Sequence, residues 1–249
     1  MNAPAAVALF GAGVGAGTIN AVVGSGTLIT FPTLLALGYP PVVANVSNAL
    51  GLVPGSLAAA YGYRRELEGQ RARLIPLSAA SLLGGLTGAL LLLALPASAF
   101  KAIVPVLIGL ACVLVIVQPK LTGRLRSRPG ARPAHGGVLL PLGVYATGVY
   151  GGYFGAAQGV LLIALLGIFL DEDLQRVNAG KNVLAALVNG VAALVFVFAA
   201  DVAWVPALVL GVGATVGGRI GAHLGRSLPA PALRWVVVAI GLIAMAKLL

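Results

Sequence analysis

The chain has 249 residues, of which 59% are hydrophobic and only 9% are charged, and its mean hydropathy is +1.03. Soluble domains carry about 25% charged residues, so this composition excludes an ordinary soluble protein and indicates an integral membrane protein. The net charge of +10 is typical of basic cytoplasmic loops in such proteins. Because the apolar runs are continuous rather than alternating, we predict an all-α membrane protein and not a β-barrel.

In chain order, the first apolar segment, residues 4–38, is long and interrupted. It contains the stretch INAVVGSGTLITFPTLLALG, in which Gly24, Ser25 and Gly26 separate two half-length apolar pieces. A second long and broken segment is predicted at 137–170. Together with the remaining apolar runs this gives about eight membrane segments. The six unbroken segments are predicted at 42–62, 74–95, 99–118, 179–200, 203–222 and 232–249.

The most polar connection is a basic linker, residues 120–136, which carries no acidic residue. It divides the chain into a first membrane repeat, 1–119, and a second, 137–249. The two repeats align without gaps when 133 is added to a residue number, so that Asn45 falls on Asn178 and Pro96 on Pro229. This register predicts that both repeats have the same order of helices, each opening with a broken or re-entrant unit.

Orientation follows from the positive charges. If the arginine-rich loop after residue 62 and the linker are both cytoplasmic, each half crosses the membrane an odd net number of times. The two repeats are then inverted relative to each other, and both termini lie outside. Inverted repeats with discontinuous helices are typical of secondary transporters, whose substrate site lies near the midplane between the repeats.

The interrupted helices are the first candidate for a binding site. Irregular backbone within the hydrocarbon region survives only where it is buried in protein or lines a polar cavity. A helix that restarts after a break presents free N–H groups and a positive dipole end, which favour an anion. We therefore expect backbone and side-chain donors from both broken units. The candidate residues are Gly24, Ser25, Gly26, Gln158 and Gly159.

Polar residues on the two helices that follow the broken units extend the candidate site. In the second repeat Asn178 and Asn182 share one helix face, and Lys181 lies one position round from it. In the matching helix of the first repeat, Asn45 and Asn48 share a face, and Ser47 lies near it. Two alternatives stay open: the asparagines can serve only as interhelical hydrogen-bond donors, and Lys181 can extend to the membrane surface.

Other glycines and the acidic residues carry different predictions. We interpret Gly84, Gly88, Gly217 and Gly221 as close helix–helix packing positions. All six acidic residues fall in predicted loops or at helix ends, so no mid-membrane carboxylate is expected. The sequence also carries no dinucleotide, serine-hydrolase or metal-ligand pattern, which predicts that the protein is not an enzyme and holds no cofactor and no metal.

The motifs NAVVGSGTLITFPTLLALG, ANVSNALGLVPGSLAAAYGYRREL, GVYGGYFGAAQGVLLIALLG and LQRVNAGKNVLAALVN, in this order, resemble those of the sulfite exporter TauE/SafE family. The resemblance covers essentially the whole chain. It implies a transporter of the bacterial inner membrane, of the type associated with export or uptake of sulfite, sulfonates such as 4-toluene sulfonate, and related organosulfur anions.

The function expected from the sequence and the resemblance is secondary or facilitated transport of a small anion, namely sulfite, a sulfonate or another organosulfur anion. The competing hypothesis is a membrane scaffold or assembly protein that transports nothing and has a tightly packed interior. Expected partners are the anionic substrate and the lipid bilayer, with no nucleic acid; self-association into a homo-oligomer is compatible with the sequence.

Overall fold

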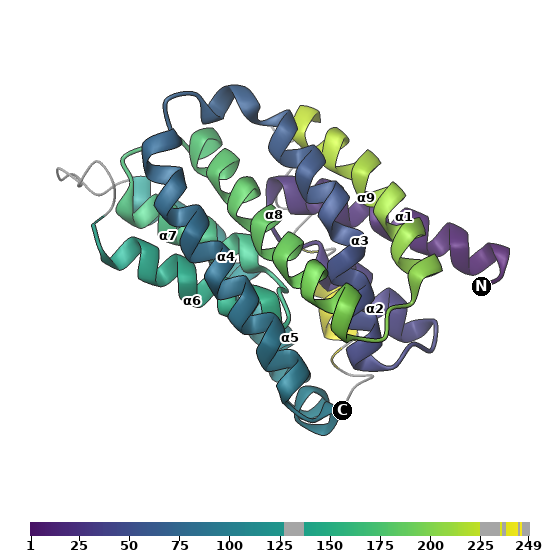
Figure 1. Ribbon diagram of the computed structural model, residues 1–249. Helices are drawn as coiled ribbons and strands as arrows, with labels where there is room; N and C mark the ends of the chain where they lie inside the picture. The colour runs from purple at the N-terminus through teal and green to yellow at the C-terminus, as the bar shows by residue number, and fades with distance from the viewer. Residues whose placement is uncertain (127–136, 225–234, 236–237, 244, 246–249) are drawn as a thin grey trace.

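The computed structural model describes residues 1–126, 137–224, 235, 238–243 and 245, and in these residues it contains helices and no strand. The elements are, in order, α1 (Ala3–Val22), α2 (Thr27–Ala36), α3 (Pro41–Gly62), the short 3-10 helix η1 (Arg64–Leu67), α4 (Arg71–Ala94), α5 (Ala97–Arg126), α6 (Leu139–Tyr153), α7 (Gln158–Phe169), α8 (Leu174–Ala199) and α9 (Trp204–Leu224) (Figure 1).

Six of the described helices are long and apolar enough to cross a membrane: α1, α3, α4, α5, α8 and α9. The predicted all-α membrane class is therefore confirmed, whereas the eight predicted segments are not, because most of 232–249 lies outside the described residues. Both long segments are interrupted as expected, α1 from α2 at residues 23–26 and α6 from α7 at residues 154–157. We call these the first break and the second break.

Local chemistry explains several helix ends. The side chain of Asn2 accepts a hydrogen bond from the Ala5 N–H at 3.1 Å and so caps α1. Asp173 caps α8 in the same way, accepting from the Gln175 and Arg176 amides at 2.8 and 3.0 Å. Since α5 continues to Arg126, the chain is still helical at 120–126, where the sequence predicted the start of the linker.

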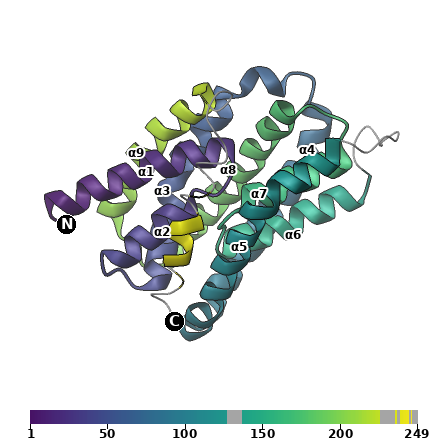
Figure 2. The ribbon, with the colours of Figure 1, turned by 180° about the vertical axis from the view of Figure 1, so that it is seen from behind.

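The helix order supports the register of 133 residues. Helix α3 begins at residue 41 and α8 at residue 174, and α4 begins at 71 and α9 at 204, so each pair is 133 residues apart. Helix α9 packs along α1 and α3, while α4 packs along α6 and α8 (Figure 1, Figure 2). The fourth helix of each half, α4 or α9, thus packs mainly against helices of the other half. The relative orientation of the halves in a membrane stays a prediction.

The expected packing role of the glycines in α4 and α9 is confirmed. A Cβ added to Gly84, Gly88, Gly217 or Gly221 would lie between 2.0 and 2.5 Å from a backbone oxygen of the facing helix. Real Cβ atoms do not approach backbone so closely. These glycines therefore allow α4 to contact α6, and α9 to contact α1, at backbone distance.

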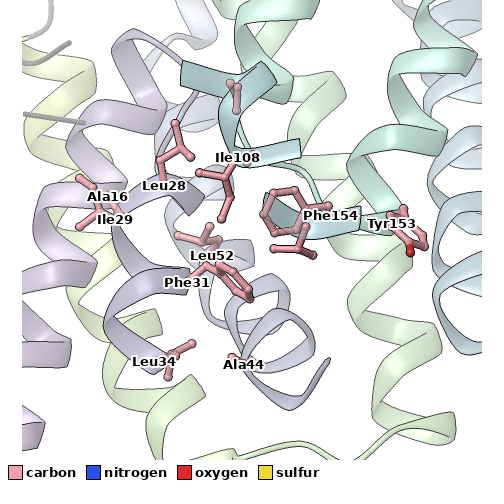
Figure 3. Close-up of a cluster of buried hydrophobic side chains, with 14 of the residues drawn as sticks. Ala16, Leu28, Ile29, Phe31, Leu34, Ala44, Leu52, Ile108, Tyr153 and Phe154 are labelled. Carbon is pink, nitrogen blue, oxygen red and sulfur yellow. The ribbon is translucent and has the colours of Figure 1, made fainter. Parts of the chain in front are cut away.

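The larger hydrophobic core surrounds the two breaks. Phe31 of α2 meets Phe154 of the second break edge to face, with ring centroids 5.2 Å apart, and Leu28, Leu52 and Ile108 pack around them (Figure 3). Edge-to-face aromatic pairs contribute roughly 0.5–1.5 kcal/mol beyond their buried area. The breaks are therefore held in a packed apolar setting contributed by α2, α3 and α5.

Candidate functional site

The two breaks touch each other through their backbones. The N–H of Gly159 donates to the carbonyl oxygen of Gly24 at 3.0 Å. Gly24 has φ +88°, and a Cβ added to it would lie 2.4 Å from the Gly159 Cα. Only glycine meets both demands, because other residues rarely adopt this φ and have no space for the side chain. We call this contact the crossing.

The C-terminal end of α1 is held by three polar side chains of α8. Lys181 Nζ donates to the carbonyl oxygens of Asn20 at 2.7 Å and Ala21 at 3.2 Å. The side-chain amides of Asn178 and Asn182 also donate to the Ala21 oxygen, at 3.0 and 3.3 Å. The last carbonyls of a helix lack intrahelical partners and form its negative end, so a cation and amide donors stabilise it.

Lys181 itself lies in the protein interior. Its side chain is among the largest fully buried ones, with 1% of its surface exposed. The alternative in which it extends to the membrane surface is therefore wrong. No carboxylate of the described residues lies within ion-pair distance of it, so carbonyl oxygens are the only partners recorded for its ammonium group there.

Asparagines of α3 make the corresponding contacts in the other half. Asn45 Nδ2 donates to the carbonyl oxygen of Tyr153, the last residue of α6, at 3.0 Å. Asn48 Oδ1 accepts from the Thr30 hydroxyl, and Asn48 Nδ2 donates to Thr27 Oγ1 at 3.4 Å. Asn45 thus holds the end of a broken helix and Asn48 holds α2, so interhelical hydrogen bonding does use their amide groups.

Two of the expected residues serve local packing. Ser47 is fully buried, and its hydroxyl oxygen accepts from the Ala203 N–H at 2.9 Å, just before α9 begins. It therefore supports the start of α9 and not the crossing. A Cβ added to Gly26 would lie 2.6 Å from the Ala16 carbonyl oxygen, so this glycine lets α2 lie close against α1.

Three of the candidate residues have a buried polar atom without a hydrogen-bond partner among the described residues: Ser25 Oγ, Gln158 Nε2 and Asn178 Oδ1. Their side chains are at most 5% exposed. An unsatisfied buried polar group costs about 1–3 kcal/mol, so such a group points to a missing polar partner. Sequence reasoning selected all three residues, but it did not show which of their atoms are unpartnered.

The two broken units offer different backbone donors. In the described residues the N–H groups of Ser25, Gly26 and Thr27, at the start of α2, donate to no recorded acceptor. At the start of α7, in contrast, the Gln158 N–H donates to the Gly155 oxygen and the Gly159 N–H to Gly24. Just before α7, however, the N–H groups of Ala156 and Ala157 also donate to no recorded acceptor. Backbone donors available to a ligand therefore lie before both short helices, and α7 adds the side chain of Gln158.

The crossing is closed in this conformation. The structure contains a cavity of about 550 Å³ where α3 and α9 end, and one of about 380 Å³ farther along the same two helices. Neither is lined by the candidate residues at the breaks. Because the unpartnered atoms are buried and the backbones of Gly24 and Gly159 are in contact, a ligand reaches these atoms only if the surrounding chain moves.

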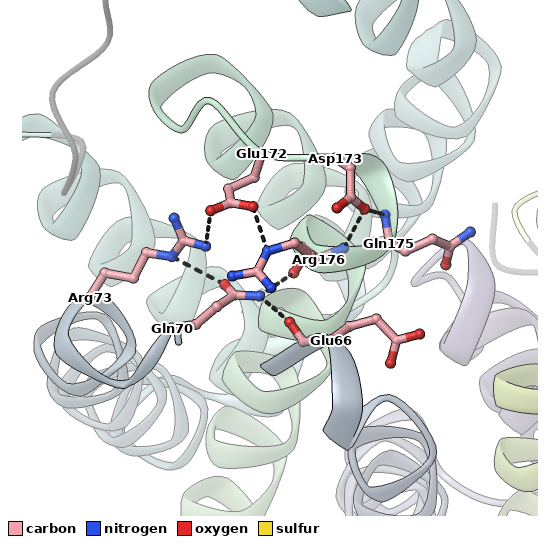
Figure 4. A network of polar contacts seen from close by, with 7 residues as sticks. All are labelled: Glu66, Gln70, Arg73, Glu172, Asp173, Gln175 and Arg176. Atoms are coloured by element: carbon pink, nitrogen blue, oxygen red, sulfur yellow. Dashed lines mark hydrogen bonds and ion pairs between the residues drawn. The ribbon is translucent and has the colours of Figure 1, made fainter. Parts of the chain in front are cut away.

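Outside the predicted membrane segments, a polar cluster joins the start of α4 to the loop before α8 (Figure 4). Glu172 forms ion pairs with Arg73 at 2.7 Å and Arg176 at 2.5 Å, and Gln70 accepts from Arg73 at 3.1 Å. Burial alone would raise the pKa of Glu172, but the hydrogen bonds and charges of the two arginines lower it below its ordinary value. Sequence analysis did not identify this cluster.

The acidic residues lie where the sequence placed them: none is within an α-helix of the described chain. Among the described residues, no three or more His, Cys, Asp or Glu side chains are grouped so that they could hold a metal ion. The chemistry available at the breaks is therefore that of amides, hydroxyls and one buried ammonium group.

Comparison with known proteins agrees with this architecture. The chain is similar to the probable membrane transporter YfcA of Escherichia coli, with 29% identity over 94% of this chain and 86% of that protein. Probable membrane transporters of Haemophilus influenzae and Sinorhizobium are 26% and 27% identical, over 96% and 97% of this chain and 92% and 91% of their own lengths. No solved structure matches the chain.

The names of these relatives indicate a membrane transporter rather than an enzyme. The family model described as "Sulfite exporter TauE/SafE" matches residues 9–248, nearly the whole chain. The resemblance seen in the sequence motifs is thereby confirmed: the chain belongs to the sulfite exporter TauE/SafE family of membrane transporters.

Proposed function

We propose that this transporter moves a small sulfur oxyanion, sulfite or an organosulfonate, and binds it at the crossing. The observation that carries the proposal is Lys181, a fully buried lysine whose Nζ has carbonyl oxygens as its only recorded partners among the described residues. Burying a charge without an opposite charge is costly, and an anion bound beside the ammonium group would offset that cost. The family description, which names sulfite, supports this class of anion.

The remaining donors of the proposed site come from both broken units. The Ser25 hydroxyl and the Gln158 side-chain amide have no partner among the described residues. The unused N–H groups at residues 25–27 add the positive end of α2. Oxygens of a sulfite or sulfonate group accept several hydrogen bonds at once, so a set of converging donors suits them. Asn178 and Asn182 contribute to the proposed site by holding the end of α1 through their side-chain amides.

Transport requires this closed site to open. We infer that the two broken units separate at the crossing, alternately toward each side of the plasma membrane, as two inverted halves with both termini outside would allow. The backbone contact between Gly24 and Gly159 is a single hydrogen bond, which leaves the units separable. The response of flux to a pH gradient distinguishes a proton-coupled secondary transporter from a facilitator. Flux that is insensitive to the gradient would exclude proton coupling.

Flux of radiolabelled sulfite into proteoliposomes tests the proposal. We expect Lys181→Met to lower the initial rate by about tenfold or more, which corresponds to about 1.4 kcal/mol of lost substrate stabilisation. Lys101→Met is the matched control, since Lys101 is an exposed lysine of α5. Equal rates for the two variants at equal amounts of folded protein would refute the assignment of Lys181.

The competing hypothesis of a non-transporting scaffold has one observation in its favour, because the crossing is closed and lined by close backbone contacts. Thiol labelling separates the two. In a Cys112→Ala background, we expect a water-soluble thiol reagent to modify Ser25→Cys during sulfite turnover but not Ser81→Cys, whose position on α4 is equally buried. Absence of labelling at both positions would favour the scaffold.

A further inference from the structure

The larger cavity lies where α3 and α9 end, beside η1, and its walls are strongly basic. It has a volume of about 550 Å³. The polar side chains that line it are Tyr61, Arg64, Arg65, Glu66, Arg219 and His223. Three guanidinium groups therefore face one carboxylate and one imidazole, so the cavity carries a net positive charge.

Part of this basic wall is held in place. The guanidinium group of Arg64 stacks on the ring of Tyr61, 4.4 Å from its centroid, and its Nη1 donates to the Tyr61 carbonyl oxygen at 3.2 Å. A guanidinium group has five N–H donors, so most of those of Arg64 stay available after this contact. Arginine groups of fixed orientation bind phosphate through paired hydrogen bonds.

The smaller cavity continues along the same face of the same two helices. It has a volume of about 380 Å³ and is lined mostly by apolar side chains of α3 and α9, Leu50, Pro54, Leu208 and Val212 among them. The apolar cavity is lined by positions 50 and 54 of α3 and by positions 208, 212 and 215 of α9. The basic cavity is lined by positions 58 and 61 of α3 and by position 219 of α9. Residues three and four apart share a helix face, so one face carries both cavities.

This face points to the lipid. Leu57, Val212 and Val216 lie on the exposed surface of α3 and α9, with 57%, 60% and 42% of their surfaces accessible. Both helices are long and apolar enough to span the membrane, so the basic cavity at their ends lies at the headgroup level. Pro54 and Tyr61 are about 10 Å apart along the helix axis at 1.5 Å per residue, which places the apolar cavity at acyl-chain depth.

We propose that the α3–α9 face binds an anionic phospholipid. The phosphate group of the lipid binds Arg64, Arg65 and Arg219, and one acyl chain occupies the apolar cavity below. Basic pockets between transmembrane helices on the cytoplasmic side bind acidic headgroups, and the positive charge at this end of α3 and α9 matches that side. This site is separate from the crossing and does not depend on which anion the protein transports.

Thermal unfolding of the detergent-purified protein, titrated with single lipids, tests the proposal. Anything that binds the native state raises its apparent stability, so phosphatidylglycerol should raise the unfolding temperature more than phosphatidylcholine of the same chains. Replacing Arg65 or Arg219 by glutamine should weaken the response about fivefold for each arginine removed. Arg71→Gln is the matched control, because Arg71 is exposed at the start of α4 and lines neither cavity.

Three results would overturn the proposal. Equal responses to the two lipids would mean that the bilayer solvates this face without a specific site. An equal response to inorganic phosphate or glycerol 3-phosphate would assign the basic cavity to a free anion. Val212→Trp, which fills the apolar cavity at an exposed position, must lower the response to phosphatidylglycerol, and an unchanged response would remove the acyl chain from the proposal.

Discussion

The crossing makes a sharp prediction for Gly24→Ala. The substitution forces a residue with a Cβ to adopt φ +88°, and it places that Cβ 2.4 Å from the Gly159 Cα. The left-handed conformation costs about 1–2 kcal/mol for a non-glycine residue. Overpacking of a well-packed interior costs about 1–3 kcal/mol more. We expect Gly24→Ala to destabilise the protein by about 2–5 kcal/mol.

Two further variants separate these contributions. Gly38 has the same φ of +88°, but nothing lies within 4 Å of an added Cβ, so Gly38→Ala measures the cost of the backbone conformation alone. Gly159 does not have a positive φ, and its added Cβ would lie 2.4 Å from the Gly24 Cα. Gly159→Ala therefore measures the loss of space at the crossing. We expect Gly38→Ala to be the mildest variant and Gly24→Ala the most severe.

Thermal unfolding in detergent, followed by the loss of monodisperse protein, is the assay. For a chain of this size, 1 kcal/mol corresponds to roughly 2–4 °C, so Gly24→Ala should lower the midpoint by several degrees more than Gly38→Ala. The reasoning is refuted if the two variants are equally stable, because that result would mean that the breaks do not meet at this contact.

Two other predictions concern residues away from the crossing. The pKa of Glu172 is lower in the folded state than its ordinary value of 4.5. Its ion pairs therefore stabilise the protein at pH values above 4.5, and this stability is lost as the pH falls through the folded-state pKa. The unfolding midpoints of wild type and Glu172→Gln, measured from pH 7 to pH 3, should therefore converge below about pH 4.5; a constant gap would contradict this. Ser47→Ala leaves the N–H of Ala203 without its recorded acceptor and should cost about 1–3 kcal/mol while sulfite flux per folded molecule stays at the wild-type level. A variant that is fully stable but has lost flux would show that Ser47 contributes to the binding site.

Several features were readable from residue types and spacing alone. The scarcity of charge and the continuous apolar runs determined the membrane class, because each spanning helix must be apolar along its whole length. The interruption at residues 24–26 and its counterpart at Gln158 and Gly159 indicated both breaks, since glycine and polar residues within such a run disrupt a continuous helix. The spacing of 133 residues between matching positions predicted the order of the helices on both sides of the linker.

Other features depended on contacts between residues far apart in the chain. The Ala21 carbonyl accepts hydrogen bonds from α8, about 160 residues away, and a backbone oxygen has no signature in a sequence. Lys181 could be placed at the surface or in the interior on spacing alone; only the packing of α8 against the end of α1 buries it.

The same distinction applies to the candidate site as a whole. Residue types alone selected Ser25, Gln158 and Asn178 as polar groups near the breaks, and the chain indeed brings them into the buried interior there. Which of their atoms are already used, and which remain for a ligand, was decided by tertiary structure, because each donor is satisfied or left unpartnered by neighbours that only the fold supplies. Sequence thus determined the membrane class and the positions of the breaks, and the fold decided their contact.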